Sequence, residues 1–225
     1  MADMKFKYTI QPYQTEAVES VVGVFAGQPF NDRFTYRRDV EIKRDVTNWM
    51  IPEEELYMGF ANARVQLDSG QLLNNIRRIQ TRNNIKLSEN VTTGGLGACS
   101  LDVEMETGTG KTYVYIKTMF ELNKQYGWSK FIVVVPSIAI REGVRKSFET
   151  MQDHFMEYYG KKARFFVYDS KNLAEIDNFS QSADINVMII NIQAFNARGK
   201  DARRIRTELD LSLIHISEPT RPLYI

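Results

Sequence analysis

The sequence predicts an α/β fold in which helices flank a parallel sheet. Two continuous apolar runs, FIVVV at 131–135 and NVMIINI at 186–192, lack the alternation of a half-exposed strand. Such runs are typical of strands that are covered on both faces, as in parallel sheets. Helical patterns separate the candidate strands, so the predicted order is β-α-β-α-β-α-β. Connections of this length are right-handed and gather the loops that follow the strands at one edge of the sheet.

The first element is a predicted helix from Ile10 to Gly23, because Pro12 suits the start of a helix and an apolar stripe follows it. The stripe consists of Ala17, Val18, Val21 and Val22. Gln14 is either an ordinary surface glutamine or, beside a nucleotide, an amide that donates to and accepts from the edge of adenine.

Residues 27–97 carry no motif that points to a chemical activity. One helix is predicted at 69–80, SGQLLNNIRRIQ, from the spacing of its leucine and isoleucine residues. The sequence TTGGLG at 92–97 indicates a flexible connection. We therefore predict that residues 1–98 comprise the first helix and an insertion whose shape the sequence does not specify.

The stretch at 101–122, LDVEMETGTGKTYVYIKTMFEL, joins a strand pattern, a glycine loop and a helix pattern. Leu101, Val103 and Met105 alternate with acidic residues, which predicts a half-buried strand that ends at the loop. Apolar residues at helical spacing then predict a helix with one buried face. These residues are Val114, Ile116, Met119, Phe120 and Leu122.

The glycine loop suits a phosphate group. It consists of Thr107, Gly108, Thr109, Gly110, Lys111 and Thr112. The two glycines let the backbone turn its N–H groups inward, and the start of a helix adds partial positive charge. Lys111 would then reach the β- and γ-phosphates of a nucleoside triphosphate, and the Thr112 hydroxyl would ligate Mg²⁺. Met105 stands where the common pattern has its first glycine, and the alternative is a glycine-rich surface turn with a solvated lysine.

Downstream of the loop helix, strands are predicted at 131–135, 163–168 and 186–192, with a short helix at 172–179. Ser137 is placed to cap the helix after the first of these strands. Its apolar face would hold Ile140, Val144, Phe148, Met151 and Phe155. The loops after the strands therefore form a second set of polar segments beside the nucleotide.

The composition is that of a globular protein with balanced charge, at 43 % hydrophobic and 25 % charged residues and a formal net charge of +1. This balance gives no support by itself to a nucleic-acid partner. No apolar run is long enough to cross a membrane, and no signal peptide precedes the first helix, so we expect a cytoplasmic protein. The single cysteine, Cys99, is predicted to be a small buried hydrophobe, and any metal is expected to arrive with the nucleotide.

Four ordered segments resemble motifs of superfamily 2 helicases and translocases, and within them the restriction (Res) subunit of type III restriction-modification enzymes. IQPYQTEAV is similar to the glutamine motif, and VEMETGTGKTYV to that subunit's motif I, Met105 included. VVVPSIAIREGV is similar to its motif Ia, and IINIQAFN to the segment before its motif II.

The resemblance implies a RecA-like lobe of an ATP-dependent DNA translocase and endonuclease, which uses ATP and Mg²⁺ on double-stranded DNA beside a methyltransferase (modification) subunit. Gln14 would contact adenine, Lys111 the phosphates and Thr112 the Mg²⁺. The residues that would lie near the DNA backbone are Pro136, Ser137, Asn191 and Gln193. Helix capping and strand termination explain these four equally well.

The family's Asp-Glu motif, which holds Mg²⁺ and orients the attacking water, is absent after Asn191. Residues 99–210 are therefore expected to form a partial lobe that does not turn over ATP by itself. The tail at 211–225, LSLIHISEPTRPLYI, breaks the pattern and is similar to a translated sequencing adapter, so we expect it to be an artefact. The alternative is a genuine strand at 211–216.

Three other functions stay open at this stage. The chain is alternatively a stand-alone nucleotide-binding module without motor activity, or part of another superfamily 2 nucleic-acid helicase. A phosphotransferase acting on small molecules is the third alternative, although Pro136 after the strand and the adenine-type Gln14 argue against it.

Overall fold

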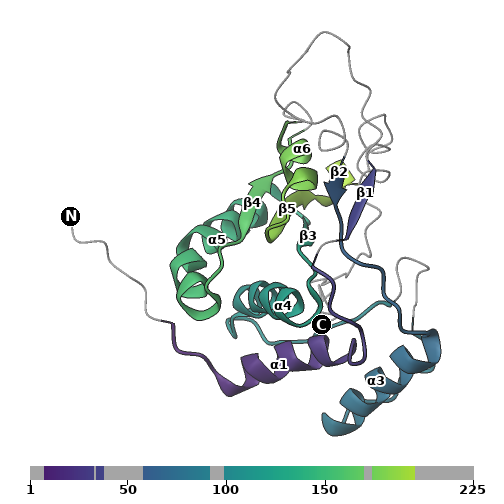
Figure 1. Cartoon of the computed structure of the whole chain (residues 1–225). Helices are drawn as coiled ribbons and strands as arrows, with labels where there is room; N and C mark the ends of the chain where they lie inside the picture. The colour runs from purple at the N-terminus through teal and green to yellow at the C-terminus, as the bar shows by residue number, and fades with distance from the viewer. Residues whose placement is uncertain (1–7, 33, 38–57, 92–98, 170–173, 196–225) are drawn as a thin grey trace.

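The computed structural model of the chain describes residues 8–32, 34–37, 58–91, 99–169 and 174–195. Three strands form a parallel sheet in the order β3-β5-β4, and two more, β1 and β2, form a separate antiparallel pair (Figure 1). The elements in chain order are α1 (Pro12–Gly23), β1 (Thr35–Arg37), β2 (Met58–Phe60), α3 (Ser69–Arg82), α4 (Lys111–Tyr126), β3 (Lys130–Val135), α5 (Ile138–Tyr159), β4 (Arg164–Val167), α6 (Ala174–Gln181), β5 (Asn186–Asn191) and α7 (Ile192–Phe195).

The central strand of the sheet is β5, which pairs with β3 over its whole length, from Lys130 opposite Asn186 to Val135 opposite Asn191. Successive side chains of β5 enter two different cores. Val187 and Ile189 pack with residues of α4 and α5, whereas Met188 and Ile190 pack with residues of α6. The continuous apolar run therefore belongs to a strand that is covered on both faces, as predicted.

The helix α1 lies alongside α4 (Figure 1). Val18 and Val22 of α1 share one hydrophobic core with the side chains of α4, α5 and the sheet. Cys99, which is 4 % exposed, belongs to the same core, and burial raises the pKa of its thiol to about 11. Its prediction as a small buried hydrophobe is confirmed. The division of the chain at residue 98 stays a prediction.

The helices predicted at 10–23, at 69–80, after the glycine loop and after Ser137 are present as α1, α3, α4 and α5. The prediction of a single buried face for α4 is wrong, because this helix has buried residues on all sides. Two of the helices begin at a side-chain cap. Asp68 accepts a hydrogen bond from the backbone N–H of Gln71 (2.8 Å) at the start of α3. Ser137 Oγ accepts one from the N–H of Ile140 (3.3 Å) at the start of α5. Ile140 itself is 37 % exposed, contrary to its predicted place on the apolar face, whereas Val144, Phe148 and Phe155 are buried as predicted.

The predicted strand at 101–105 is wrong. These residues form no ladder with any described strand, although the predicted alternation is present: Leu101, Val103 and Met105 are half-buried and the acidic residues between them are exposed. An apolar alternation establishes which side chains face the core, but a strand also needs a neighbour for its backbone hydrogen bonds. The described part of the sheet therefore has three strands where four were predicted.

The antiparallel pair β1-β2 joins Thr35 to Phe60 and Arg37 to Met58, in a region for which the sequence predicted no strand. Strands of three residues are too short for a periodicity to be recognised. Three expectations lie outside the described residues: the connection at 92–97, the end of the lobe at 196–210 and the tail at 211–225. None of the helices that the structure describes is both long and apolar enough to cross a membrane.

Candidate nucleotide-binding site

The glycine loop at 107–112 leads into an uncapped helix. Gly110 is the N-cap of α4, and no side chain caps this helix at its start. The first N–H groups of a helix have no partner within it, so those of the first turn stay available to a ligand. Gly108 and Gly110 have φ angles of 82° and 87°, in the left-handed region that favours glycine. The conformation predicted from the glycine spacing is therefore present.

The glycine loop is open on one side, and the side chains of Lys111 and Thr112 are not used within the described part of the protein. A side chain added at Gly108 would meet no atom within 4 Å, so the loop is open on that side. Lys111 and Thr112 are half-buried, and within the described residues neither side chain forms a hydrogen bond or an ion pair. An ammonium and a hydroxyl at the start of an uncapped helix match the donor set that binds phosphate and its Mg²⁺. The described residues contain no cluster of three or more His, Cys, Asp or Glu side chains placed to hold a metal.

The first turn of α1 contacts the glycine loop, although the two segments are far apart in the sequence. Gln14 Nε2 donates a hydrogen bond to the Thr109 carbonyl (2.9 Å), and the Tyr13 hydroxyl donates to the same oxygen (3.2 Å). Gln14 Oε1 accepts from the backbone N–H of Gln11 (3.3 Å), which ties the side chain to its own helix. Gln14 is 8 % exposed, so the alternative of an ordinary surface glutamine is excluded.

Gly110 is required to be glycine by its positive φ and also by the close approach of the Gln14 side chain. A Cβ atom at this position would lie 2.5 Å from Gln14 Nε2, well inside van der Waals contact. A side chain at residue 110 would therefore displace the Gln14 amide from Thr109. The positive φ and the contact with α1 act on the same residue.

Polar contacts farther along α1 and α4 keep the two helices in register. Lys117 Nζ donates to Thr15 Oγ1 (3.2 Å), and the Tyr126 hydroxyl donates to the Val22 carbonyl (3.0 Å). Burial lowers the pKa of Lys117, and the nearby carboxylates of Glu121 and Glu19 oppose that shift. These contacts lie away from the loop, so α1 is held in place independently of it.

The four predicted DNA-contacting residues lie at one edge of the sheet. Val135 pairs with Asn191 at the ends of β3 and β5, so Pro136 and Ser137 follow one strand end and Gln193 follows the neighbouring one. Pro136, Ser137 and Gln193 are exposed. Asn191 Oδ1 is buried and has no hydrogen-bond partner within the described residues. The structure therefore brings together the residues that the sequence placed near one another.

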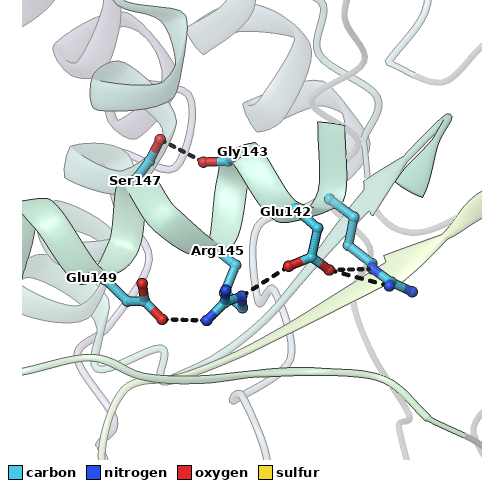
Figure 2. Close-up of polar contacts among 6 residues, drawn as sticks. Glu142, Gly143, Arg145, Ser147 and Glu149 are labelled. Atoms are coloured by element: carbon cyan, nitrogen blue, oxygen red, sulfur yellow. Dashed lines mark hydrogen bonds and ion pairs between the residues drawn. The ribbon is translucent and has the colours of Figure 1, made fainter. Parts of the chain in front are cut away.

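The exposed face of α5 carries a ladder of ion pairs (Figure 2). Arg145 bonds Glu142 (Nε to Oε2, 3.0 Å) and Glu149 (NH1 to Oε1, 2.5 Å), and Arg141 bonds the other oxygen of Glu142 (3.2 Å). Hydrogen bonds from Arg145 and Arg141 hold the pKa of Glu142 below its ordinary range. The cations beside Ser137 are therefore already paired with carboxylates.

Comparison with known proteins gives a match over most of the chain. A family model described as "Type III restriction enzyme, res subunit" matches residues 65–214, which include the glycine loop at 107–112 and the whole parallel sheet. The chain belongs to this family.

Relatives in the Res family are similar at the level expected for a shared fold. The Res subunit of the type III restriction-modification enzyme EcoP15I from Escherichia coli is 31 % identical over 166 residues, covering 68 % of this chain and 17 % of the relative. The EcoPI Res subunit from Escherichia phage P1 is 29 % identical over 172 residues, covering 70 % and 18 %. The StyLTI Res subunit from Salmonella typhimurium strain LT2 is 36 % identical over 133 residues, covering 51 % and 13 %. The chain thus spans less than a fifth of the length of these relatives.

The Res domain is a RecA-like helicase lobe, and the three-stranded parallel sheet with its helices is part of such a lobe. The predicted fold class is confirmed. Tyr13 and Gln14 lie before the region that the family model matches, although the structure places both against the loop inside it.

Tyr13 was not among the predicted site residues. In the sequence it is an aromatic residue beside Gln14, and nothing local shows that its hydroxyl contacts a loop 96 residues away. The available signal was its position in the first turn of the helix, next to a residue already assigned to the site.

Proposed function

We propose that this chain is the ATP-binding, amino-terminal part of a Res subunit, and that residues 107–112 hold the phosphates of ATP with Mg²⁺. The observation that carries the proposal is the uncapped start of α4 behind a loop with two positive-φ glycines. Lys111 would neutralise the phosphate charge, and the Thr112 hydroxyl would bind the metal ion. ATP would supply the free energy for the work of the full-length protein, whereas this part of the chain would supply a preformed anion site.

We propose that Gln14 contacts adenine while it remains on the loop. An amide nitrogen has two hydrogens and an amide oxygen two lone pairs. The hydrogen bonds to Thr109 and from Gln11 use one of each. The remaining hydrogen and lone pair match the donor and acceptor on the edge of adenine.

In the full-length protein we propose that ATP binding drives translocation on double-stranded DNA together with a modification subunit. The relatives are named as Res subunits of type III restriction-modification enzymes, which supports this role. Pro136, Ser137, Asn191 and Gln193 would face the DNA backbone from the edge of the sheet. Of these, Ser137 already uses its hydroxyl oxygen to cap α5.

Replacing Lys111 by alanine tests the proposal for ATP. The affinity of the purified chain for a fluorescent ATP analogue with Mg²⁺ is expected to fall roughly 10- to 100-fold, the range for losing a hydrogen bond to a charged group. Lys124→Ala is the matched control, because Lys124 is an exposed lysine in the last turn of the same helix. Equal affinity in Lys111→Ala and Lys124→Ala would show that the loop does not bind the triphosphate.

A further inference from the structure

Thr109 is the residue at which the phosphate loop is fastened to the rest of the protein. Its carbonyl accepts hydrogen bonds from the Tyr13 hydroxyl (3.2 Å) and from Gln14 Nε2 (2.9 Å). On its other side, its N–H (3.4 Å) and its hydroxyl (2.6 Å) both donate to the Glu106 carbonyl. The residues on either side of it, Gly108 and Gly110, are glycines at positive φ. A short segment between two glycines has wide conformational freedom unless its middle is held.

Both donors lie on α1, which packs against α4. α1 is buried against α4 through Val18 and Val22, and the Lys117–Thr15 and Tyr126–Val22 hydrogen bonds fix its position along that helix. The position of the Thr109 carbonyl is therefore set by α1. Because Thr109 is followed directly by Gly110 and the first turn of α4, its position also orients the N–H groups that face a phosphate.

Tyr13 and Gln14 differ in how they are placed. Gln14 is 8 % exposed and also bonds its own helix, so its removal would disturb α1 as well as the loop. Tyr13 is 47 % exposed, and the hydroxyl that reaches Thr109 is its polar contact to the loop. Removing that one oxygen opens no cavity and leaves the helix intact.

We propose that Tyr13 is a positioning residue of the nucleotide site: its hydroxyl fixes the Thr109 carbonyl and so preorganises the phosphate loop for the triphosphate. This role of Tyr13 rests on the proposed ATP-binding function. Tyr13 would affect the binding of the phosphates and not of the base, since its hydroxyl contacts the loop backbone. A preformed loop binds more tightly because the ordering is completed before the ligand arrives.

The test compares Tyr13→Phe with the unsubstituted 225-residue chain, using ATP and inorganic tripolyphosphate to displace a fluorescent ATP analogue. Tripolyphosphate has no base, so it reports on the loop alone. Tyr13→Phe is expected to weaken both ligands by the same factor, about two- to tenfold, as for the loss of one hydrogen bond. The melting temperature is expected to stay unchanged. Tyr158→Phe is the matched control, an exposed tyrosine on α5 at 56 % exposure.

The possible outcomes separate this role from the proposed function. If Tyr13→Phe binds both ligands as the unsubstituted chain does, the positioning role is overturned, while a loss in Lys111→Ala still supports ATP binding. If ATP alone is weakened, Tyr13 contacts the base and the positioning role is again overturned. If the unsubstituted chain binds neither ligand, the proposed function fails and the positioning role fails with it.

Discussion

The long helices α4 and α5 pack against each other, but their first turns are satisfied in opposite ways. At α4 the N-cap is Gly110, no side chain caps the helix, and Lys111 has no partner within the described residues. At α5 the hydroxyl of Ser137 caps the helix, and Arg141 and Arg145 are paired with Glu142. The start of α4 leaves its N–H donors and its lysine available to a ligand, whereas at the start of α5 the N–H donor and the arginines bind side chains of the same helix or its cap.

The unused donors at the start of α4 favour a ligand there, whereas the capped start of α5 needs none. Both helix starts follow a predicted strand, and the sequence predicts a ligand for each, phosphate at α4 and DNA at α5. Partial positive charge is present at any helix start, so it does not distinguish them. The two helix starts differ in whether the chain itself supplies acceptors for the N–H groups and the cations of the first turns. At α5 it does, which supports a helix cap as the first role of Ser137.

The largest effect is expected from a matched pair of glycine substitutions. Gly110→Ala forces a non-glycine residue to a φ of 87° and displaces the Gln14 amide from Thr109. The strain of about 1–3 kcal/mol is expected to lower ATP affinity by roughly one to two orders of magnitude. Gly143→Ala in α5 meets no atom within 4 Å and is expected to stabilise the protein by roughly 0.5–1 kcal/mol, with ATP affinity unchanged.

Titration with the fluorescent ATP analogue and thermal unfolding would measure both variants. If Gly110→Ala and Gly143→Ala bound ATP equally well, the start of α4 would not differ in function from the start of α5.

A smaller effect is expected from removing the cap of α5. Ser137→Ala should lower the free energy of unfolding by about 1 kcal/mol, because the N–H of Ile140 loses its acceptor. ATP affinity should not change. Ser137→Asp keeps a capping oxygen and should retain the stability, which chemical denaturation would show.

Ser147→Ala provides the control for this substitution. Its hydroxyl donates to the Gly143 carbonyl within the helix (2.9 Å, Figure 2), and its loss should leave stability nearly unchanged. A drop in ATP affinity in Ser137→Ala would contradict the assignment of Ser137 as a cap alone.

The smallest effect is expected from Glu142→Gln, because the ion pairs of Arg141 and Arg145 with Glu142 lie on an exposed surface. The pKa of Glu142 is lowered in the folded protein, so its stabilising contribution is present above the ordinary value of 4.5 and is lost as the pH falls through the folded value. The difference in melting temperature from the unsubstituted chain should therefore be small at neutral pH and disappear in acid.

Glu157→Gln, an exposed position farther along α5, is the reference for this measurement. A melting-temperature difference for Glu142→Gln that persisted in acid, or that exceeded the effect of Ser137→Ala, would show that the ladder stabilises the start of α5 more than its cap does.

Prediction from the sequence succeeded where the determining residues are neighbours. The spacing of Gly108 and Gly110 gave the turn, Ser137 gave the start of α5, and the apolar run at 186–192 gave a strand buried on both faces. The same reasoning failed at 101–105, where the alternation is real but no described neighbour pairs with the segment. It also missed β1 and β2, which are too short to show a periodicity and are defined by their pairing with each other.

Adjacent residues were enough to predict the turn at Gly108 and Gly110 and the approximate bounds of the helices, because dihedral preferences and periodicity are local. They did not predict that α4 is buried on all sides, since that depends on the elements packed around it. The position of β5 between β3 and β4, and the meeting of Tyr13 and Gln14 at the carbonyl of Thr109, depend on tertiary packing. The separation along the chain is 96 residues for Tyr13 and 95 for Gln14. Contacts over such distances depend on how α1 packs against α4, and no local pattern in the sequence encodes that packing.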